Sequence, residues 1–205
     1  MSTTNPATSS PAPLPALFLI RHGQTAWSLT GQHTGRTDLP LTQTGRAEAA
    51  KLAPRLQPVT FGRVFSSPRL RARETCQIAG LGSAMEIEPD LAEWDYGDYE
   101  GLLASEILQR RPGWNIYRDG CPGGESPAQI SDRADRLISR LRPLAGNTAL
   151  FSHGHFSRIL TIRWLGLTVP DAACLSISTA SLSILSYEQT LSRSTITLWN
   201  STGNF

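Results

Sequence analysis

The stretch Leu17-Phe18-Leu19-Ile20-Arg21-His22-Gly23-Gln24 decides the fold class and the expected place of the functional site. Its four apolar residues stand between Pro15 and Gly23, a pattern typical of a short buried strand. Residues that directly follow such a strand lie at its carboxyl end, where open α/β sheets bind their ligands. We expect His22 there to attack phosphorus, Arg21 to hold phosphoryl oxygens, and Gly23 to leave room for the group to approach.

Five more apolar runs predict strands, and helical patterns lie between most of them. The predicted strands cover 17–20, 63–66, 85–88, 149–152, 182–187 and 195–199. The predicted helices cover 42–56, 69–79, 127–141 and 156–165. Strands that alternate with helices predict an α/β fold, a three-layer α/β/α sandwich around a mainly parallel sheet. The last two strands have no helix between them, which predicts an antiparallel edge.

Helix boundaries can be predicted from capping residues and prolines. Thr42 is a suitable cap, and Pro54 is expected to end or bend the helix that follows it. Ser126 before Pro127 is a strong helix start, because a capping hydroxyl precedes a proline in the first helical position. The apolar residues after this start fall on one stripe, which consists of Ile130, Ala134, Leu137, Ile138 and Leu141.

The composition excludes several classes of protein. A chain of 205 residues can form one domain with a sizeable core. A net charge of +2 gives no reason to expect a nucleic acid or a membrane surface as partner. Residues 1–15 contain no charged side chain and no signal-peptide pattern, which predicts a disordered tail before a single domain over 16–205. No stretch reaches the length of a membrane span.

The cysteines suggest neither a disulfide framework nor a metal site. Cys76, Cys121 and Cys174 are scattered and odd in number. Reduced thiols in a cytoplasmic protein are therefore expected. We also find no carboxylate cluster that would bind a metal ion.

Three further segments carry chemistry of the same kind. Ser66-Ser67-Pro68-Arg69-Leu70-Arg71 follows a strand and opens a helix, and a helix start near arginines is a suitable anion site. Glu93 stands beside Trp94, and a carboxyl group among aromatic side chains suits a general acid. Phe151-Ser152-His153-Gly154-His155 repeats the strand, histidine and glycine of the first motif.

In this order the motifs resemble the histidine phosphatase superfamily, also called phosphoglycerate mutase-like. The resemblance covers nearly the whole chain from Leu17 onward. It is most specific over 21–28, 34–42, 93–101 and 114–121, where the chain is similar to broad-specificity acid phosphatases and sedoheptulose-bisphosphatase-like members. Where many relatives carry Asn, this chain has Ser28, whose hydroxyl reaches less far.

The resemblance implies roles for individual residues. His22 would be the nucleophile that becomes phosphohistidine, and Glu93 would exchange protons with the leaving oxygen and with water. Three side chains would surround the transferring phosphoryl group, namely Arg21, Arg71 and His153. Further residues would bind substrate: Gln24, Ser28, Thr34, Gly35, Tyr96, Gly154 and His155. This chemistry requires no metal and no cofactor.

Some assignments stay open at this point. His155 either faces the substrate or is a satisfied histidine at a helix start, and His33 is interpreted as a loop residue. The aromatic segment 92–125 is expected to form a lid or a pocket wall. Within it, Trp114 and Tyr117 are either core residues or part of that wall.

The expected activity is hydrolysis of small phosphomonoesters, with a sugar phosphate as the most plausible partner. A phosphoglycerate-type mutase is the first alternative, but the compact segment between Glu93 and His153 lets water reach a phosphohistidine. A non-catalytic module that binds a phosphorylated ligand is the second alternative, against which stands the full set of catalytic residues. The sequence leaves the oligomeric state open, a homodimer included.

Overall fold

The first predicted strand lies inside a six-stranded sheet with the order β3-β2-β4-β1-β5-β6. The computed structural model describes residues 14–203. Its strands are β1 (Leu17–Arg21), β2 (Phe61–Ser66), β3 (Met85–Ile87), β4 (Asn147–Ser152), β5 (Leu182–Tyr187) and β6 (Ser194–Ser201). The first four are parallel, whereas β5 and β6 run antiparallel at one edge. The predicted fold class is confirmed.

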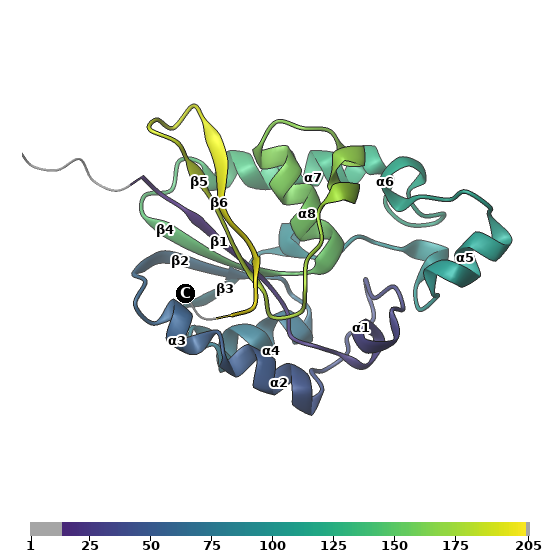
Figure 1. The fold of residues 1–205 in the computed structure, drawn as a ribbon, viewed down its shortest axis with the longest axis horizontal. Coiled ribbons are helices and arrows are strands. Elements are labelled where there is room, and N and C mark those ends of the chain that lie inside the picture. The colour runs from purple at the N-terminus through teal and green to yellow at the C-terminus, as the bar shows by residue number, and fades with distance from the viewer. Residues whose placement is uncertain (1–13, 204–205) are drawn as a thin grey trace, which may run out of the picture.

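Helices cover both faces of this sheet (Figure 1). On one side lie α2 (Gln43–Ala50), α3 (Ala53–Leu56) and α4 (Leu70–Ile78), and on the other α7 (Pro127–Leu141) and α8 (Gly154–Trp164). Side chains of β1 alternate between the two layers, as the pleat of a strand requires. Leu17 and Leu19 join the core under α7 and α8, while Ile20 joins the core on the side of α2 and α4.

Two helices differ from the prediction at their boundaries. The helix expected over 42–56 is divided into α2 and α3, and Pro54 lies in the first turn of α3, where no backbone N–H is needed. The helix expected from residue 156 begins at Gly154. His153 is its N-cap in an extended conformation, so the first turn of α8 starts directly after β4. That placement directs the free N–H groups of α8 toward the carboxyl end of the sheet.

The start of α7 agrees with the prediction. The Ser126 hydroxyl accepts a hydrogen bond from the Gln129 N–H at 3.2 Å, and the Gln129 side chain accepts one from the Ser126 N–H at 2.8 Å. This reciprocal pair is a capping box, with Pro127 in the first turn. The predicted apolar stripe of α7 is buried against α8.

The aromatic segment contains short helices that were not predicted. They are α5 (Ala104–Arg110) and α6 (Ile116–Asp119), and α1 (Ala26–Thr30) precedes them in the chain. All three lie at one end of the molecule, beyond the helical layers (Figure 1). Short 3₁₀ turns occur at Gly82–Ala84, Pro89–Leu91, Gly97–Tyr99 and Val169–Cys174. Trp94 and Tyr117 are core residues, so part of this segment forms core and not a lid.

The predicted tail over 1–15 lies outside the described residues apart from Leu14 and Pro15. Leu14 packs against the core under α7 and α8. Within residues 14–203, no helix combines the length and the apolar character that a membrane crossing needs.

Candidate active site

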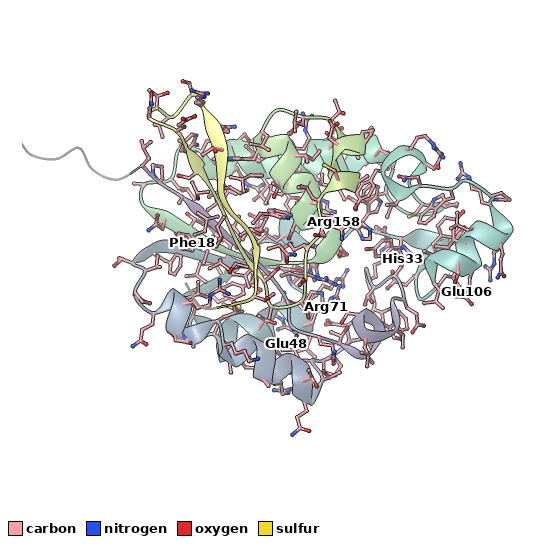
Figure 2. All side chains as sticks on the ribbon, in the orientation of Figure 1. Phe18, His33, Glu48, Arg71, Glu106 and Arg158 are labelled. Carbon is pink, nitrogen blue, oxygen red and sulfur yellow. The ribbon has the colours of Figure 1, made fainter. Side chains whose placement is uncertain are left out.

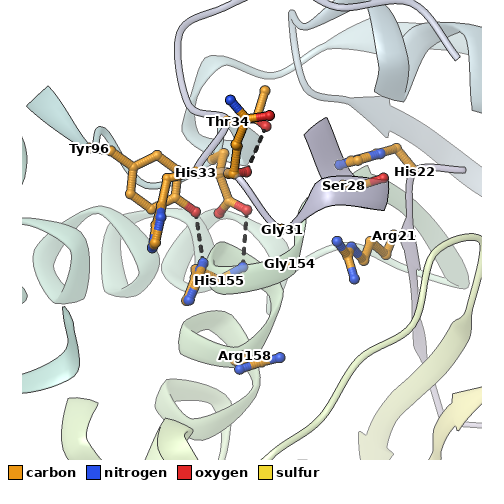
Figure 3. A pocket seen from close by; sticks show the side chains of 12 residues that line it. Arg21, His22, Ser28, Gly31, His33, Thr34, Tyr96, Gly154, His155 and Arg158 are labelled. Atoms are coloured by element: carbon orange, nitrogen blue, oxygen red, sulfur yellow. Dashed lines mark hydrogen bonds between the residues drawn. The ribbon is translucent and has the colours of Figure 1, made fainter. Parts of the chain in front are cut away.

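A pocket of about 140 Å³ opens where β1 and β4 end (Figure 3). It is lined by Arg21, His22, Ser28, Gly31, Gln32, His33, Thr34, Glu93, Tyr96, Gly154, His155 and Arg158. Arg21 and His22 lie on one side, and Tyr96 and His155 on the other, as the close view shows. The residues after two neighbouring parallel strands therefore meet at one place, as the sequence predicts.

His22 is held as a neutral imidazole with a defined tautomer. Its Nδ1 donates a hydrogen bond to the backbone carbonyl of Gly23 at 2.7 Å, so Nε2 carries no proton. The side chain is buried, and burial lowers the pKa of His22 well below its usual value, with Arg71 and Arg21 lowering it further. An unprotonated Nε2 beside cations is the form of histidine that can attack phosphorus.

Gly23 serves backbone packing. A Cβ on Gly23 would lie 2.3 Å from the carbonyl oxygen of Gly45 in α2, and a Cβ on Gly45 would lie 2.1 Å from that of Gln24. Its N–H also donates to the Thr75 hydroxyl in α4 at 3.0 Å. The expected role of Gly23, room for an approaching group, is thus accompanied by a tight contact that fixes the loop after β1.

Arg21 lines the pocket beside the first turn of α8. Its Nη1 donates to the carbonyl of Ile177 at 2.7 Å, and its buried Nε has no hydrogen-bond partner among the described residues. The guanidinium carbon lies 3.4 Å from the position of a Cβ on Gly154, so a larger residue there would press on it. An arginine with an unpartnered N–H beside a helix start is well suited to hold an anion.

Arg71 and His153 are fully buried next to His22 and do not line the open pocket. The rings of His22 and His153 lie 5.2 Å apart. Arg71 Nε donates to His153 Nδ1 at 3.2 Å, which leaves His153 Nε2 to donate to the Ser67 hydroxyl at 2.7 Å. Burial lowers the pKa of His153, and the Arg71 charge lowers it further. Their direct contact with a phosphoryl group stays a prediction.

Arg71 also fixes the loop that forms the pocket edge. Its Nη atoms donate to the carbonyls of Thr34, Gly35 and Thr37 at distances from 2.8 to 3.2 Å. One of its five N–H groups, on Nη1, is left over by these contacts. Arg71 therefore positions this loop as well as the histidine pair.

Glu93 is held by three backbone N–H groups. Its Oε1 accepts from Trp94 at 2.9 Å and from Phe156 at 2.8 Å, and its Oε2 accepts from His155 at 3.1 Å. Two of these donors belong to the first turn of α8. Because Oε1 already has two donors, Oε2 keeps a lone pair for a proton that is exchanged in the pocket.

The predicted substrate-binding residues divide into two groups. Those that line the pocket are Ser28, Thr34, Tyr96, Gly154 and His155. Gln24 and Gly35 do not. Gln24 donates its N–H to Glu48 and accepts from the Thr42 hydroxyl, and the N–H of Gly35 donates to the Glu100 carboxylate at 3.0 Å. The Ser28 hydroxyl accepts from the Thr25 N–H at 2.8 Å, so it also caps α1.

Two further residues of the pocket were not predicted. His33 was interpreted as a loop residue, yet it is buried in the pocket wall, where its ring stacks on His155 at 6.0 Å. Arg158 lines the pocket from α8 and donates to the Tyr117 hydroxyl at 2.9 Å. Arg158 follows His155 by three residues, and this helical spacing is the signal that could have identified it.

His155 is surrounded by aromatic rings and faces the pocket. The Tyr96 hydroxyl shares a hydrogen bond of 2.7 Å with His155 Nδ1, and the rings of Tyr117 and Trp94 lie 5.7 Å and 6.5 Å away. Burial lowers the pKa of His155, and Arg158 lowers it further. The ring therefore stays neutral near neutral pH and can exchange hydrogen bonds with an uncharged hydroxyl. Within residues 14–203, no group of three or more histidine, cysteine or acidic side chains is arranged to hold a metal ion.

Comparison with known proteins gives a consistent set of relatives. The family model of the histidine phosphatase superfamily (branch 1) matches residues 17–202. An acid phosphatase of Mycobacterium tuberculosis is 43% identical over 176 residues, which cover 84% of this chain and 86% of that protein. Sedoheptulose 1,7-bisphosphatase of Saccharomyces cerevisiae is 38% identical over 191 residues, which cover 78% of this chain and 70% of that protein.

The fold comparison agrees with the sequence comparison. The solved structure of an open reading frame product of Mycobacterium tuberculosis superposes with a TM-score of 0.87 at 38% identity. The match covers 92% of this chain and 98% of that one.

Proposed function

Because the chain belongs to the histidine phosphatase superfamily, as a phosphoric monoester hydrolase, we propose that it hydrolyses small sugar phosphates through a phosphohistidine on His22. The observation that carries this proposal is the hydrogen bond from His22 Nδ1 to the Gly23 carbonyl, which leaves Nε2 free to attack. Phosphoryl transfer needs positioning and stabilisation of charge, and Arg21 supplies a permanent cation beside that nitrogen.

In the first step, His22 Nε2 forms a bond to phosphorus while the bond from phosphorus to the ester oxygen breaks. Glu93 gives its proton to that oxygen, so the alcohol leaves neutral and Glu93 becomes a carboxylate. Arg21 and the start of α8 stabilise the charge on the equatorial phosphoryl oxygens. Support comes from the position of Glu93, whose Oε2 keeps a lone pair in the pocket.

In the second step, water attacks the phosphorus of phosphohistidine. Glu93 takes a proton from that water, the bond from phosphorus to Nε2 breaks, and His22 returns to its neutral form. Inorganic phosphate leaves, and Glu93 is again protonated for the next cycle. The same carboxyl group thus serves as acid and then as base.

For the substrate, we propose a sugar phosphate with a second anionic group. Arg158 lines the pocket, and its buried Nε has no hydrogen-bond partner among the described residues. The printed partners of Arg21 and Arg158 are uncharged, and Glu93 is the single acidic residue of the lining. A pocket with two cations and one acid favours a substrate with more negative charge than one phosphate brings. The cytoplasm remains the proposed location.

The test is a panel of phosphorylated sugars, sedoheptulose and fructose bisphosphates included, with release of inorganic phosphate as the readout. We expect release from at least one sugar phosphate and its loss in His22→Ala. Labelled phosphate that appears on an acceptor sugar instead of in solution would favour the mutase alternative. No turnover of the panel or of p-nitrophenyl phosphate between about pH 5 and 8, the range in which histidines titrate, would favour a binding module.

A further inference from the structure

Arg133 in α7 lies next to the segment that carries Glu93, at the side away from His22. It donates all five of its guanidinium N–H groups. Nε and Nη2 bind the two carboxylate oxygens of Glu125 at 2.8 and 2.7 Å. Nη1 donates to the carbonyls of Asp90 and Ala92 at 2.9 and 2.7 Å, and Nη2 also donates to the carbonyl of Glu93 at 3.3 Å.

The partner of Arg133 holds the same segment from its other end. The Glu125 carboxylate accepts from the Asp95 N–H at 2.9 Å, and the Glu125 carbonyl accepts from the Trp94 indole at 2.9 Å. Glu93 therefore lies between the carbonyl contacts of Arg133 and the contacts of Glu125. Such an arrangement leaves the backbone of Glu93 little freedom to shift or rotate.

Arg133 also contacts the third partner of the Glu93 carboxylate. Its guanidinium lies over the ring of Phe156, 4.3 Å from the ring centre, and the Phe156 N–H donates to Glu93 Oε1 at 2.8 Å. One side chain thus touches the backbone of Glu93 and the residue that orients its carboxylate. Its side chain is 11% exposed, so water competes little for these bonds.

We propose that Arg133 is a positioning residue for the proton transfers of Glu93. This inference rests on the proposed function, in which Glu93 is the acid of the first step and the base of the second. Without the planar fork of Arg133, Glu93 Oε2 would no longer be fixed against the leaving oxygen. A misplacement of about 1 Å from a mutation outside the chemistry can cost about a hundredfold in rate.

The same helix offers a matched control. Arg136 lies one turn after Arg133 and forms an ion pair with the side chain of Asp90 at 2.8 Å, but its side chain is 54% exposed. It binds no backbone atom of the Glu93 segment in the described contacts. Arg136→Met removes a charge and an ion pair of α7 while leaving Glu93 in place.

The experiment compares two esters that depend differently on the acid. p-Nitrophenolate leaves with little help from a proton donor, whereas a sugar alkoxide needs one. We expect Arg133→Met to lower kcat/KM for a sugar phosphate by about 10- to 100-fold and for p-nitrophenyl phosphate by less than about threefold. Arg136→Met should change neither value. Arg133→Lys keeps the charge but not the fork, and it provides the same comparison if Arg133→Met does not fold.

A double variant separates positioning from general stability. In a Glu93→Gln background the Arg133 substitution should have almost no further effect on kcat/KM, because the group it positions is already gone. Equal losses on both esters, or the full loss repeated in the Glu93→Gln background, would overturn the inference while leaving Glu93 as the acid. If Glu93→Gln itself failed to discriminate between the esters, the proposed role of Glu93 would fall, and this inference with it.

Discussion

The Nδ1 of His22 donates to the carbonyl of Gly23 at 2.7 Å, and this contact fixes which nitrogen faces the pocket. Gly23 in turn is pressed against Gly45 and bonded to Thr75, so the acceptor cannot turn away without moving α2 and α4. The proposed nucleophile is thus oriented by the backbone of the following residue. No side chain is needed for this orientation.

The tautomer of His22 leads to a prediction about protonation. Burial, Arg71 and Arg21 all lower the pKa of His22, so the ring should remain neutral with its proton on Nδ1 at pH 6. Ring nitrogen chemical shifts of the protein labelled with ¹⁵N-histidine would report the tautomer directly. A protonated His22 ring at pH 6, or a proton on Nε2, contradicts the assignment.

The same burial predicts how stability depends on pH. Three buried histidines have lowered pKa values in the fold, namely His22, His153 and His155. Below the ordinary histidine pKa of about 6.5, the unfolded chain binds protons that the folded chain does not. The free energy of unfolding should therefore be fully present above that pH and fall as the pH decreases toward 4.

For each such histidine the loss is about 1.4 kcal/mol per pH unit until its folded-state pKa is reached. Urea unfolding at a series of pH values between 7 and 4 measures this slope. His155→Gln removes one of the three groups and should reduce the slope by a third. A stability that stays constant from pH 7 to pH 5 would show that these histidines take up protons in the fold.

Gly45 gives a prediction about the loop after β1. A Cβ at this position would lie 2.1 Å from the carbonyl oxygen of Gln24, so Gly45→Ala must displace α2 or the loop. We expect a loss of stability of about 1–3 kcal/mol, as for other overpacked sites, together with a lower kcat. Thr44→Ala, at the exposed neighbouring position, should stay within about 0.5 kcal/mol of the parent protein. Equal stability of both variants would contradict the tight contact.

Arg158 gives a prediction about substrate choice. If it binds a second anionic group, Arg158→Met should lower kcat/KM for a sugar bisphosphate by about 10- to 100-fold, as expected for a hydrogen bond between charged groups. The value for p-nitrophenyl phosphate should change by less than about threefold. Arg163→Met is the control, because Arg163 lies on the same helix and pairs with Asp135 away from the pocket. Equal losses on both substrates would speak against a second anion site.

The sequence was sufficient for features that depend on neighbouring residues. The strand before Arg21, the cap at Ser126 and the alternation of strands and helices are local patterns, and each led to the observed element. The family resemblance identified most of the pocket, from His22 to His155. Figure 2 shows how many side chains surround these few, and His33 and Arg71, far apart in sequence, both point toward the same region.

Other features depend on contacts between distant segments. His33 enters the pocket because its Nδ1 donates to the carbonyl of Leu102, 69 residues later, and no local pattern encodes that bond. Arg133 looks like any arginine on a solvated helix face until the Glu93 segment is folded against it. Gly35 matched the motif, yet its N–H is taken up by Glu100. Tertiary packing, not local preference, decides such roles.

The central claim is that His22 carries the phosphoryl group, and rapid quenching of a single turnover tests it most directly. Mixing the protein with a phosphate-labelled ester and digesting the quenched sample should yield a labelled peptide that contains His22. The label should be lost in acid and retained in base, as expected for a phosphorus–nitrogen bond. Retained turnover in His22→Ala, or a label on any other residue, would contradict the account.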